Sequence, residues 1–444
     1  MSRSFATVAR QLKWGAVAAA AWVCTQVPAQ TLSALVDVAK AYDAQVLAAQ
    51  KQVDAALARA DQSRASLLPQ VGLGGGYTIA DTDWNAHTKA RSLALSASQS
   101  LYNQANDVGR DQARLAVEQA HIQLSQAEQA LMANVSQAYF DLLSAKAQLI
   151  VIAASKKAAA EQLARAKRNF EVGTATITDT HEAQAQYDRI IAAEISAQND
   201  ERVKQLALDQ LVGQNQVKPH DLRNGVALPS MEPQNVEAWV NQGLGNNPQI
   251  KLAQLGVRAA ELDIDKVKAG RMPTVDLAYK YTDPKVIGSD CRTLASGGSS
   301  ICNNQSLSLS FSVPLFTGYA IENGVKAAVA NKASTEAQMS NAQRSVSQNI
   351  RQAYFSLLSG TSQIKALQAA VASSQSALDA NRTGYEVGVR INADVLNAQT
   401  QLYQTEVSLT TARYNVLNGG IKLRQAAGTL SKQDLEAIDR LLQP

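Results

Sequence analysis

A sharp turn between two long helices is predicted where the sequence reads Gly384-Tyr385-Glu386-Val387-Gly388-Val389-Arg390-Ile391-Asn392-Ala393-Asp394-Val395-Leu396-Asn397. Gly388 suits the end of the first helix, because glycine tolerates the left-handed backbone conformation that closes a helix C-terminus. Asn392 can cap the second helix, since its side-chain oxygen accepts a hydrogen bond from an amide of the first turn. Helical patterns run into this stretch and out of it, so we expect it to form the tip of a long helical hairpin.

The same turn occurs once before in the chain. Phe170-Glu171-Val172-Gly173 is followed by Thr176-Ile177-Thr178-Asp179, and Gly173 lies 215 residues before Gly388. The segment QAYFDLLS at 137–144 returns as QAYFSLLS at 352–359, at the same offset. Nearer the N-terminus the offset is 204, as from Pro69 to Pro273. An unbroken register over this distance indicates an internal duplication.

The duplication and the N-terminus together divide the chain. Residues 1–29 are predicted to be a secretory signal peptide, with a basic region, an apolar region and the small-residue ending Val27-Pro28-Ala29. Cys24 invites a lipoprotein interpretation, but Ala21-Trp22-Val23 before it is a poor context for lipid attachment. We expect a first repeat over 30–213, a linker over 214–236, a second repeat over 237–428 and a C-terminal tail over 429–444.

Composition narrows the functional class. Removing the signal peptide lowers the formal net charge from +4 to +1, so most of the excess positive charge belongs to the signal peptide. The charge of the mature chain therefore does not indicate a nucleic-acid partner. No other stretch is expected to reach the ~20 apolar residues that a membrane-spanning helix needs. A mature chain that crosses a membrane would therefore cross it with strands.

Long helices are predicted on both sides of each tip. From 103 to 171 no proline interrupts the pattern and Gly109 is the only glycine, which allows a helix of roughly 100 Å. Apolar residues between Leu124 and Ile152 follow alternating three- and four-residue steps, the spacing of a coiled-coil seam. Shorter helices are expected over 31–68 and 179–211.

Period-two patterns predict a β-hairpin in each repeat, at about 70–102 and 274–316. Leu307, Leu309 and Phe311 alternate with serines, and strands of about ten residues suit a membrane with lipid on one face and water on the other. The alternative is an exposed hairpin with one face on a layer of helices. The second hairpin is longer and holds Cys291 and Cys302, which either form a disulfide in an exported protein or remain two free thiols.

Four strands cannot close a barrel, and an open sheet edge is not tolerated in lipid. Closure requires at least two copies of the chain, and three copies would give twelve strands. The predicted fold class is therefore mainly α with a transmembrane β-barrel: three duplicated chains form a twelve-stranded barrel on a twelve-helix tunnel.

The chain resembles the TolC family of trimeric outer-membrane channels over essentially all of the mature sequence. The resemblance is carried by the duplicated helix–hairpin–helix layout, the strand end Val313-Pro314-Leu315-Phe316-Thr317-Gly318, the 384–397 tip and the ending Ala427-Gly428-Thr429-Leu430. It implies a homotrimer in the outer membrane with a periplasmic tunnel closed at its inner end. It also implies docking to an inner-membrane transporter with a periplasmic adaptor, and a belt formed by the linker and the tail.

The resemblance further implies which residues constrain the closed tip. Asp179 on the first tip matches a carboxylate that Tyr385 and Arg390 of the second tip would contact. Gln162 matches a residue whose acidic partner is replaced here by Arg382, so that bond is not expected.

Asp394 and Asn397 match the two aspartates that the resemblance places at the narrowest aperture of the family's channels. A trimer of this chain would therefore have one ring of carboxylates there instead of two. The alternative for Asp179 and Asp394 is simple helix capping, because both lie in the first turn of a helix.

No catalytic constellation, cofactor motif or metal-ligand spacing is found in the sequence, so we expect a passive exit duct and not an enzyme. Two other classes of protein stay open: a periplasmic coiled-coil adaptor of an efflux pump, and a trimeric coiled-coil surface protein without a channel. No residue pattern separates secretion of proteins by a type I system from efflux of small molecules.

Overall fold

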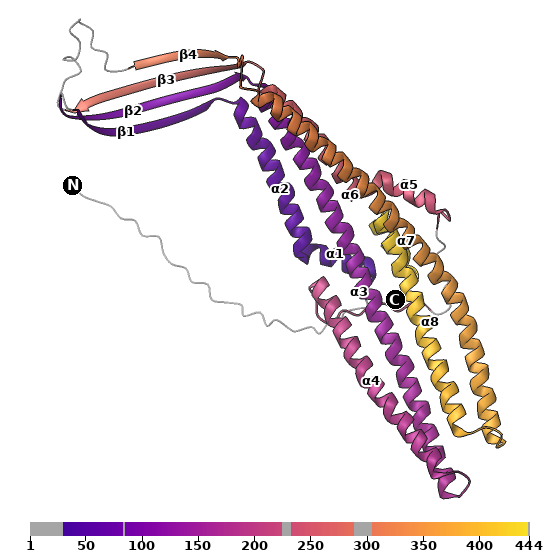
Figure 1. Ribbon diagram of the computed structural model, residues 1–444. Helices are drawn as coiled ribbons and strands as arrows, with labels where there is room; N and C mark the ends of the chain where they lie inside the picture. Colours follow the sequence, from indigo (N-terminus) through magenta and orange to yellow (C-terminus); the bar gives the residue numbers. More distant parts are fainter. Residues whose placement is uncertain (1–29, 83–84, 224–231, 288–303, 443–444) are drawn as a thin grey trace, which may run out of the picture.

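The computed structural model describes residues 30–82, 85–223, 232–287 and 304–442. The chain is elongated, with a small sheet at one end and a bundle of long helices extending from it (Figure 1). The predicted signal peptide with Cys24, the loop with Cys291 and Cys302, and part of the linker lie outside the described residues.

The two repeats contain matching elements. The first contains α1 (Leu32–Tyr42), α2 (Ala44–Arg64), the 3-10 turn η1 (Ala65–Leu67), β1 (Gln70–Thr82), β2 (Asn85–Tyr102), α3 (Gln104–Glu171) and α4 (Ile177–Val212). The second contains α5 (Val236–Asn246), α6 (Pro248–Ala269), β3 (Thr274–Ile287), β4 (Asn304–Ser312), α7 (Ala320–Glu386) and α8 (Asn392–Ala426), and α9 (Lys432–Asp439) follows.

The helix expected over 31–68 is interrupted, and this prediction was wrong. α1 ends before Asp43, whose carboxylate accepts a hydrogen bond of 2.8 Å from the Val46 amide and so caps α2. In the second repeat Asn247 caps α6 in the same way, through the Gln249 amide at 2.8 Å. Short polar side chains compete for backbone amides, and at both positions this competition ends one helix and begins the next.

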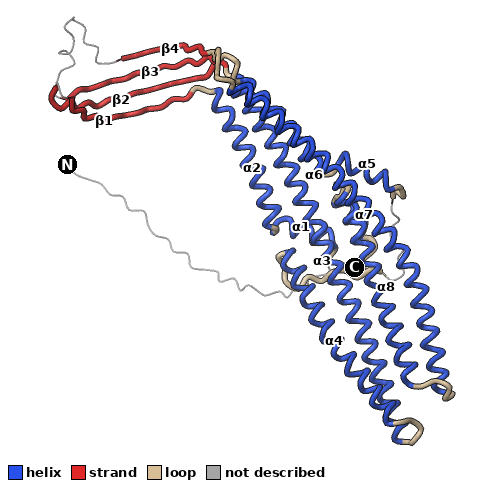
Figure 2. The backbone as a smooth tube through the Cα atoms, in the orientation of Figure 1, coloured by secondary structure: helices blue, strands red, loops and turns tan. Residues whose placement is uncertain are grey.

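The long helices form columns. α3 has 68 residues and α7 has 67, about 100 Å each. Near the sheet the order of neighbours is α2, α3, α6, α7; towards the tips it is α4, α3, α8, α7 (Figure 2). α3 contains an 18-residue stretch that is apolar enough to cross a membrane by length and composition, contrary to the sequence expectation. This stretch is part of a much longer helix that packs against α4, α6 and α8.

The four strands form one antiparallel sheet in the order β1-β2-β3-β4. Its register places Leu73, Leu95 and Tyr281 in one row, and the next row on the opposite face contains Ser96, Lys280 and Ser306. The sheet therefore has an apolar face and a small or polar face. No helix among the described residues covers either face, which argues against the alternative of a hairpin packed on helices (Figure 1).

The strands are 13, 18, 14 and 9 residues long, so three of them exceed the expected ten. Pairing extends beyond the apolar alternation: Thr82 opposes Asn85, and Arg91 opposes Lys285. The ladder is made of backbone hydrogen bonds, so strand pairing can continue where the side chains are polar. Hydrophobic periodicity does not detect such a part of a strand.

α1, α9 and residues 217–222 pack against the middle of the bundle, and we call these segments the belt. The Asp439 carboxylate in α9 accepts hydrogen bonds from the amides of Leu32 at 2.7 Å and Ser33 at 3.1 Å, and so caps α1 across the length of the sequence. The buried Tyr139 hydroxyl of α3 donates to the His220 carbonyl and accepts from the His220 amide. Its repeat counterpart, the Tyr354 hydroxyl, donates to the Gln234 carbonyl.

Candidate functional site

The two hairpin tips are built alike. Gly173 and Gly388 have φ angles of +79° and +80°, the left-handed conformation that ends a helix at low cost for glycine alone. Behind them the Thr174 amide donates to the Asn169 carbonyl at 2.8 Å, and the Val389 amide donates to the Gly384 carbonyl at 2.9 Å. These bonds satisfy carbonyls that the helix ends leave free.

The Asp179 carboxylate belongs to a capping box in its own hairpin. It accepts hydrogen bonds from the Thr176 amide at 2.8 Å and the Thr176 hydroxyl at 2.7 Å, while the Asp179 amide donates to that hydroxyl oxygen at 3.2 Å. Such a box stabilises the start of α4. Within the described chain neither Tyr385 nor Arg390 is hydrogen-bonded to Asp179. The predicted network is therefore not formed inside one chain.

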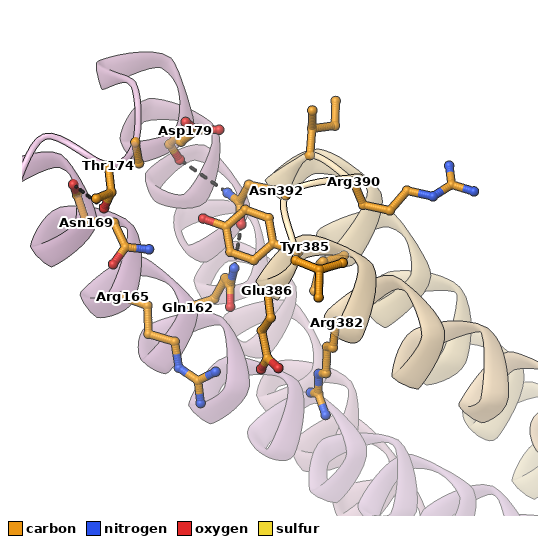
Figure 3. A pocket seen from close by; sticks show the side chains of 15 residues that line it. Gln162, Arg165, Asn169, Thr174, Asp179, Arg382, Tyr385, Glu386, Arg390 and Asn392 are labelled. Carbon is orange, nitrogen blue, oxygen red and sulfur yellow. Dashed lines mark hydrogen bonds between the residues drawn. The ribbon is translucent and has the colours of Figure 1, made fainter.

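Asn392 links the two tips instead of capping α8, and the predicted cap was wrong. The residue before it, Ile391, occupies the cap position, and its side chain has no acceptor. The Asn392 side chain is fully buried, accepts a hydrogen bond from the Gln162 Nε2 group, and donates to the Asp179 carbonyl at 3.4 Å (Figure 3). Gln162 is thus a tip-linking residue, but its partner is an amide from α8.

The other second-tip residues are arranged around this link. Tyr385 packs with Leu378, Val395 and Leu402, the apolar cluster between α7 and α8. Figure 3 shows its ring in front of Asn392, whereas the Arg390 side chain points away from Asp179. Arg390 lies in the turn before α8, where it is instead 3.7 Å from the Asp394 carboxylate in the first turn of that helix, and it is largely exposed. Arg390 therefore remains available to a neighbouring molecule.

A cleft of about 720 Å³ opens between the two tips. Gln162, Asp179 and Asn392 line it, together with the charged side chains of Arg165, Arg382, Glu386 and Arg390. In Figure 3 the Glu386 carboxylate lies between the guanidinium groups of Arg165 and Arg382. Because polar groups outnumber apolar ones and the cleft is open to solvent, it is a charged seam between two hairpins and not an enclosed ligand pocket.

Asp394 and Asn397, the residues matched to the aperture, lie one turn apart at the start of α8. Asn397 is exposed, and the Asp394 carboxylate is partly exposed and 3.5 Å from the Ile391 amide. Among the described residues, no group of three or more acidic, histidine or cysteine side chains is arranged to hold a metal ion. The two tips thus offer charged and hydrogen-bonding side chains along the seam between them.

Comparison with known proteins identifies the family. The sequence matches the model of the outer membrane efflux protein family over residues 35–214 and 239–429, one match for each repeat. This chain belongs to the outer membrane efflux protein family. It is 32% identical to the outer membrane protein TolC of Vibrio cholerae, over 96% of this chain and 95% of that protein. It is 34% identical to TolC of Escherichia coli, over 88% of this chain and 80% of that protein. The resemblance to the TolC family is thereby confirmed.

A further relative and two solved structures extend the comparison. The proteases secretion protein PrtF of Dickeya chrysanthemi is 27% identical, over 69% of this chain and 66% of that protein. The crystal structure of CusC aligns with a TM-score of 0.78 at 20% identity, covering 90% of this chain and 92% of CusC. The outer membrane protein VceC from Vibrio cholerae aligns with a TM-score of 0.76 at 19% identity, covering 89% of this chain and 96% of VceC. The predicted fold of the single chain, mainly helical with a small sheet, is therefore confirmed.

Sequence reasoning found the two turns of the site and missed its central contact. Asn392 was interpreted only as a helix cap, although the 215-residue offset places it opposite Ile177 of the first tip. The available signal was that the second tip has a polar residue, Asn392, where the first tip has the apolar Ile177. This difference indicates that Asn392 has a role that the first tip lacks.

Proposed function

We propose that this protein is the outer-membrane exit duct of a tripartite export system. It passively conducts substrates from an inner-membrane transporter across the periplasm and the outer membrane. The observation that carries this proposal is the combination of a sheet with one apolar and one polar face and a helical bundle about 100 Å long. Membership of the family and the likeness to TolC support it.

The proposed assembly is a homotrimer. β1 and β4 are edge strands in the described chain, and unpaired edges are not tolerated in lipid. Three copies would join these edges into a twelve-stranded barrel in the outer membrane and place the helices in the periplasm. The belt around Tyr139 and Asp439 would encircle the middle of the tunnel, and the tips would close its inner end.

The proposed gate uses contacts of two kinds. The Gln162–Asn392 link holds the two tips of one chain together. Tyr385 and Arg390 would contact Asp179 in the assembled channel, where Arg390 is free to reach a neighbouring chain. Asp394 would place one ring of carboxylates at the aperture, with Asn397 as a neutral ring below it.

A periplasmic adaptor and an inner-membrane transporter are the proposed partners, because the likeness to TolC implies a tripartite export system. PrtF takes its name from protease secretion, so secreted proteins are one proposed substrate class; small molecules exported by an efflux pump are the second. Co-purification of the transporter separates the two classes.

The test is the behaviour of the full chain in a Gram-negative cell. We expect it in the outer-membrane fraction as an oligomer that resists SDS and dissociates to monomers on heating. A protein recovered as a soluble monomer from the periplasm would contradict the proposal and favour the adaptor class. A trimer in the membrane that forms no conducting pore would favour the surface-protein class.

A further inference from the structure

The polar face of the sheet is charged at two positions, both in β3. Among the residues whose side chains the structure describes, this face consists of glycine, alanine, serine, threonine, asparagine and Gln70, apart from Asp276 and Lys280. At the offset of 204 residues the first repeat has Gly72 and Gly76 in their places, so each chain has one charge of each sign on this face. The two charged groups stand out from a wall of small neutral side chains.

The Lys280 ammonium is not neutralised by a neighbour. In the register Lys280 lies between Ser96 of β2 and Ser306 of β4, and its side chain is exposed. The Ser96 hydroxyl donates to the Gly72 carbonyl at 3.3 Å. Within the described part of the chain, no hydrogen bond or ion pair joins Lys280 to another residue. Lys280 therefore presents a full positive charge to the space in front of the polar face.

Asp276 lies on the same face but nearer the helices. β3 begins beside the helices at Thr274 and runs away from them, so Lys280 is farther out (Figure 1). Four residues of a strand span about 13 Å, which exceeds the Debye length of about 10 Å at 0.1 M salt. The two charges therefore act at separate levels of the sheet.

In a barrel closed by three copies, this face would surround the lumen, because the apolar face would meet lipid. β3 is not an edge strand, so Ser96 and Ser306 stay beside Lys280 after closure. Twelve strands about 4.8 Å apart and tilted by about 40° enclose a lumen with a backbone radius of about 12 Å. With three lysine side chains extending inward, every point of that cross-section lies within about one Debye length of an ammonium group.

We infer that Lys280 forms a ring of three ammonium groups, which makes the outer part of the lumen favour anionic solutes over cationic ones. The ring rests on the proposed trimeric duct and adds a charge preference at its exit. An outgoing solute would pass Asp276 first and Lys280 second. A cation from the medium would meet the ammonium ring before it reached the Asp276 carboxylates. Together with Asp394 at the tips, the ring would give the duct opposite charges towards its two ends.

The test measures the electrostatic potential in front of this face, in chains whose Cys291 and Cys302 are replaced by serine. Gly72→Cys places a thiol in the same row as Lys280, two strands away, and its side-chain carbon would be in ordinary contact with Ser96 Oγ at 3.5 Å. In a closed barrel the Lys280 of the neighbouring copy would lie at a similar distance on the other side. Labelling rates are compared for an anionic sulfonate and a cationic trimethylammonium methanethiosulfonate, and their ratio cancels any change in the reactivity of the thiol itself.

Lys280→Gln should lower the ratio of the anionic to the cationic labelling rate roughly threefold at 0.1 M salt. The reason is that two ammonium groups about 10 Å from the thiol act on the two reagents in opposite directions. Asp276→Asn should raise the ratio, and by less, because Asp276 is four residues farther along β3. Leu73→Cys on the apolar face is the matched control, and lipid should protect it from both reagents.

The outcomes separate the ring from the duct. A conducting oligomer in which Lys280→Gln leaves the ratio unchanged overturns the ring and leaves the duct standing. Labelling of Leu73→Cys together with protection of Gly72→Cys would mean that the sheet faces the other way, and it also overturns the ring. If Gly72→Cys does not assemble, Ser96→Cys repeats the measurement with a side chain of similar size beside Lys280. Absence of conduction in the parent and in every variant would contradict the duct, and the ring with it.

Discussion

Gln162 of α3 donates a hydrogen bond to the side-chain oxygen of Asn392, the first residue of α8, and this contact ties the two tips of one chain together. Asn392 also donates to the Asp179 carbonyl, so one buried amide bridges both helices of the first hairpin. The repeat has no second copy of this bridge, because Ile177 stands in the corresponding place. Among the described residues this bridge between the tips therefore occurs once in a chain and has no repeat counterpart.

The first prediction concerns this bridge. Asn392→Ala should favour the open tip, because a net hydrogen bond contributes about 0.5–1.5 kcal/mol, which raises the open population by roughly two- to twelve-fold. Single-channel recording in planar bilayers measures the change. Gln184→Ala is the matched control, since that side chain bonds only to Asp188 within α4. Equal conductance of both variants and the parent would argue against a gating role for Asn392.

The second prediction concerns the belt. Tyr139→Phe should lower the free energy of unfolding by about 1–3 kcal/mol, because it leaves the buried His220 amide without the Tyr139 acceptor. Tyr354→Phe removes a single donated bond and should cost about 0.5–1.5 kcal/mol. Thermal unfolding followed by circular dichroism compares the two. If Tyr354→Phe lowers the free energy of unfolding more than Tyr139→Phe does, the Tyr139 hydroxyl is not the main anchor of the belt.

The third prediction separates the two phenylalanines of the repeat. Phe140→Ala should cost about 3–5 kcal/mol in the folding of each chain, because the ring is buried inside it. Phe355→Ala should leave the folded chain intact, because the Phe355 ring is 55% exposed in a single chain. It should lower the temperature at which the oligomer dissociates in SDS, since an exposed apolar surface marks an interaction site. Gel mobility before and after heating measures the second effect. Oligomers of Phe355→Ala as heat-resistant as the parent's would contradict a role of Phe355 between chains.

The fourth prediction is a dependence on pH. Burial in α8 raises the pKa of the Glu406 carboxyl above its usual value, so the folded state disfavours the charged form. This penalty on stability is present above the raised pKa and disappears as the pH falls below the ordinary glutamate value, where folded and unfolded states are both protonated. Glu406→Gln should therefore raise thermal stability at neutral pH and have no effect in acid. A stabilisation that persists unchanged in acid would point to packing as its cause.

The sequence predicts the parts of this molecule that repeat or alternate. Gly173 and Gly388 mark both tips, and the octapeptide at 137–144 and 352–359 reveals the duplication, because backbone conformation and register leave direct traces in residue order. Asp43 and Asn247 were missed because a capping side chain and a solvent-facing one look alike in a helical pattern.

The contacts across the fold were not predictable in the same way. The Asp439 cap on α1 and the Gln162–Asn392 bridge join residues that lie hundreds of positions apart. No local periodicity records such pairs. Only the Gln162–Asn392 bridge leaves a signal in the sequence, because at the 215-residue offset the first repeat has Ile177 where the second has Asn392.

The account is tested most directly by the conductance of the purified full chain in planar bilayers. The parent should insert as a trimer and show a small, steady conductance, because its tips are closed. Tyr385→Phe combined with Arg390→Ser should show a larger conductance, since both groups are proposed to constrain Asp179 in the assembled channel, and Arg344→Ser on the exposed side of α7 should match the parent. A correctly inserted trimer that conducts no ions in any of these forms would contradict an exit duct.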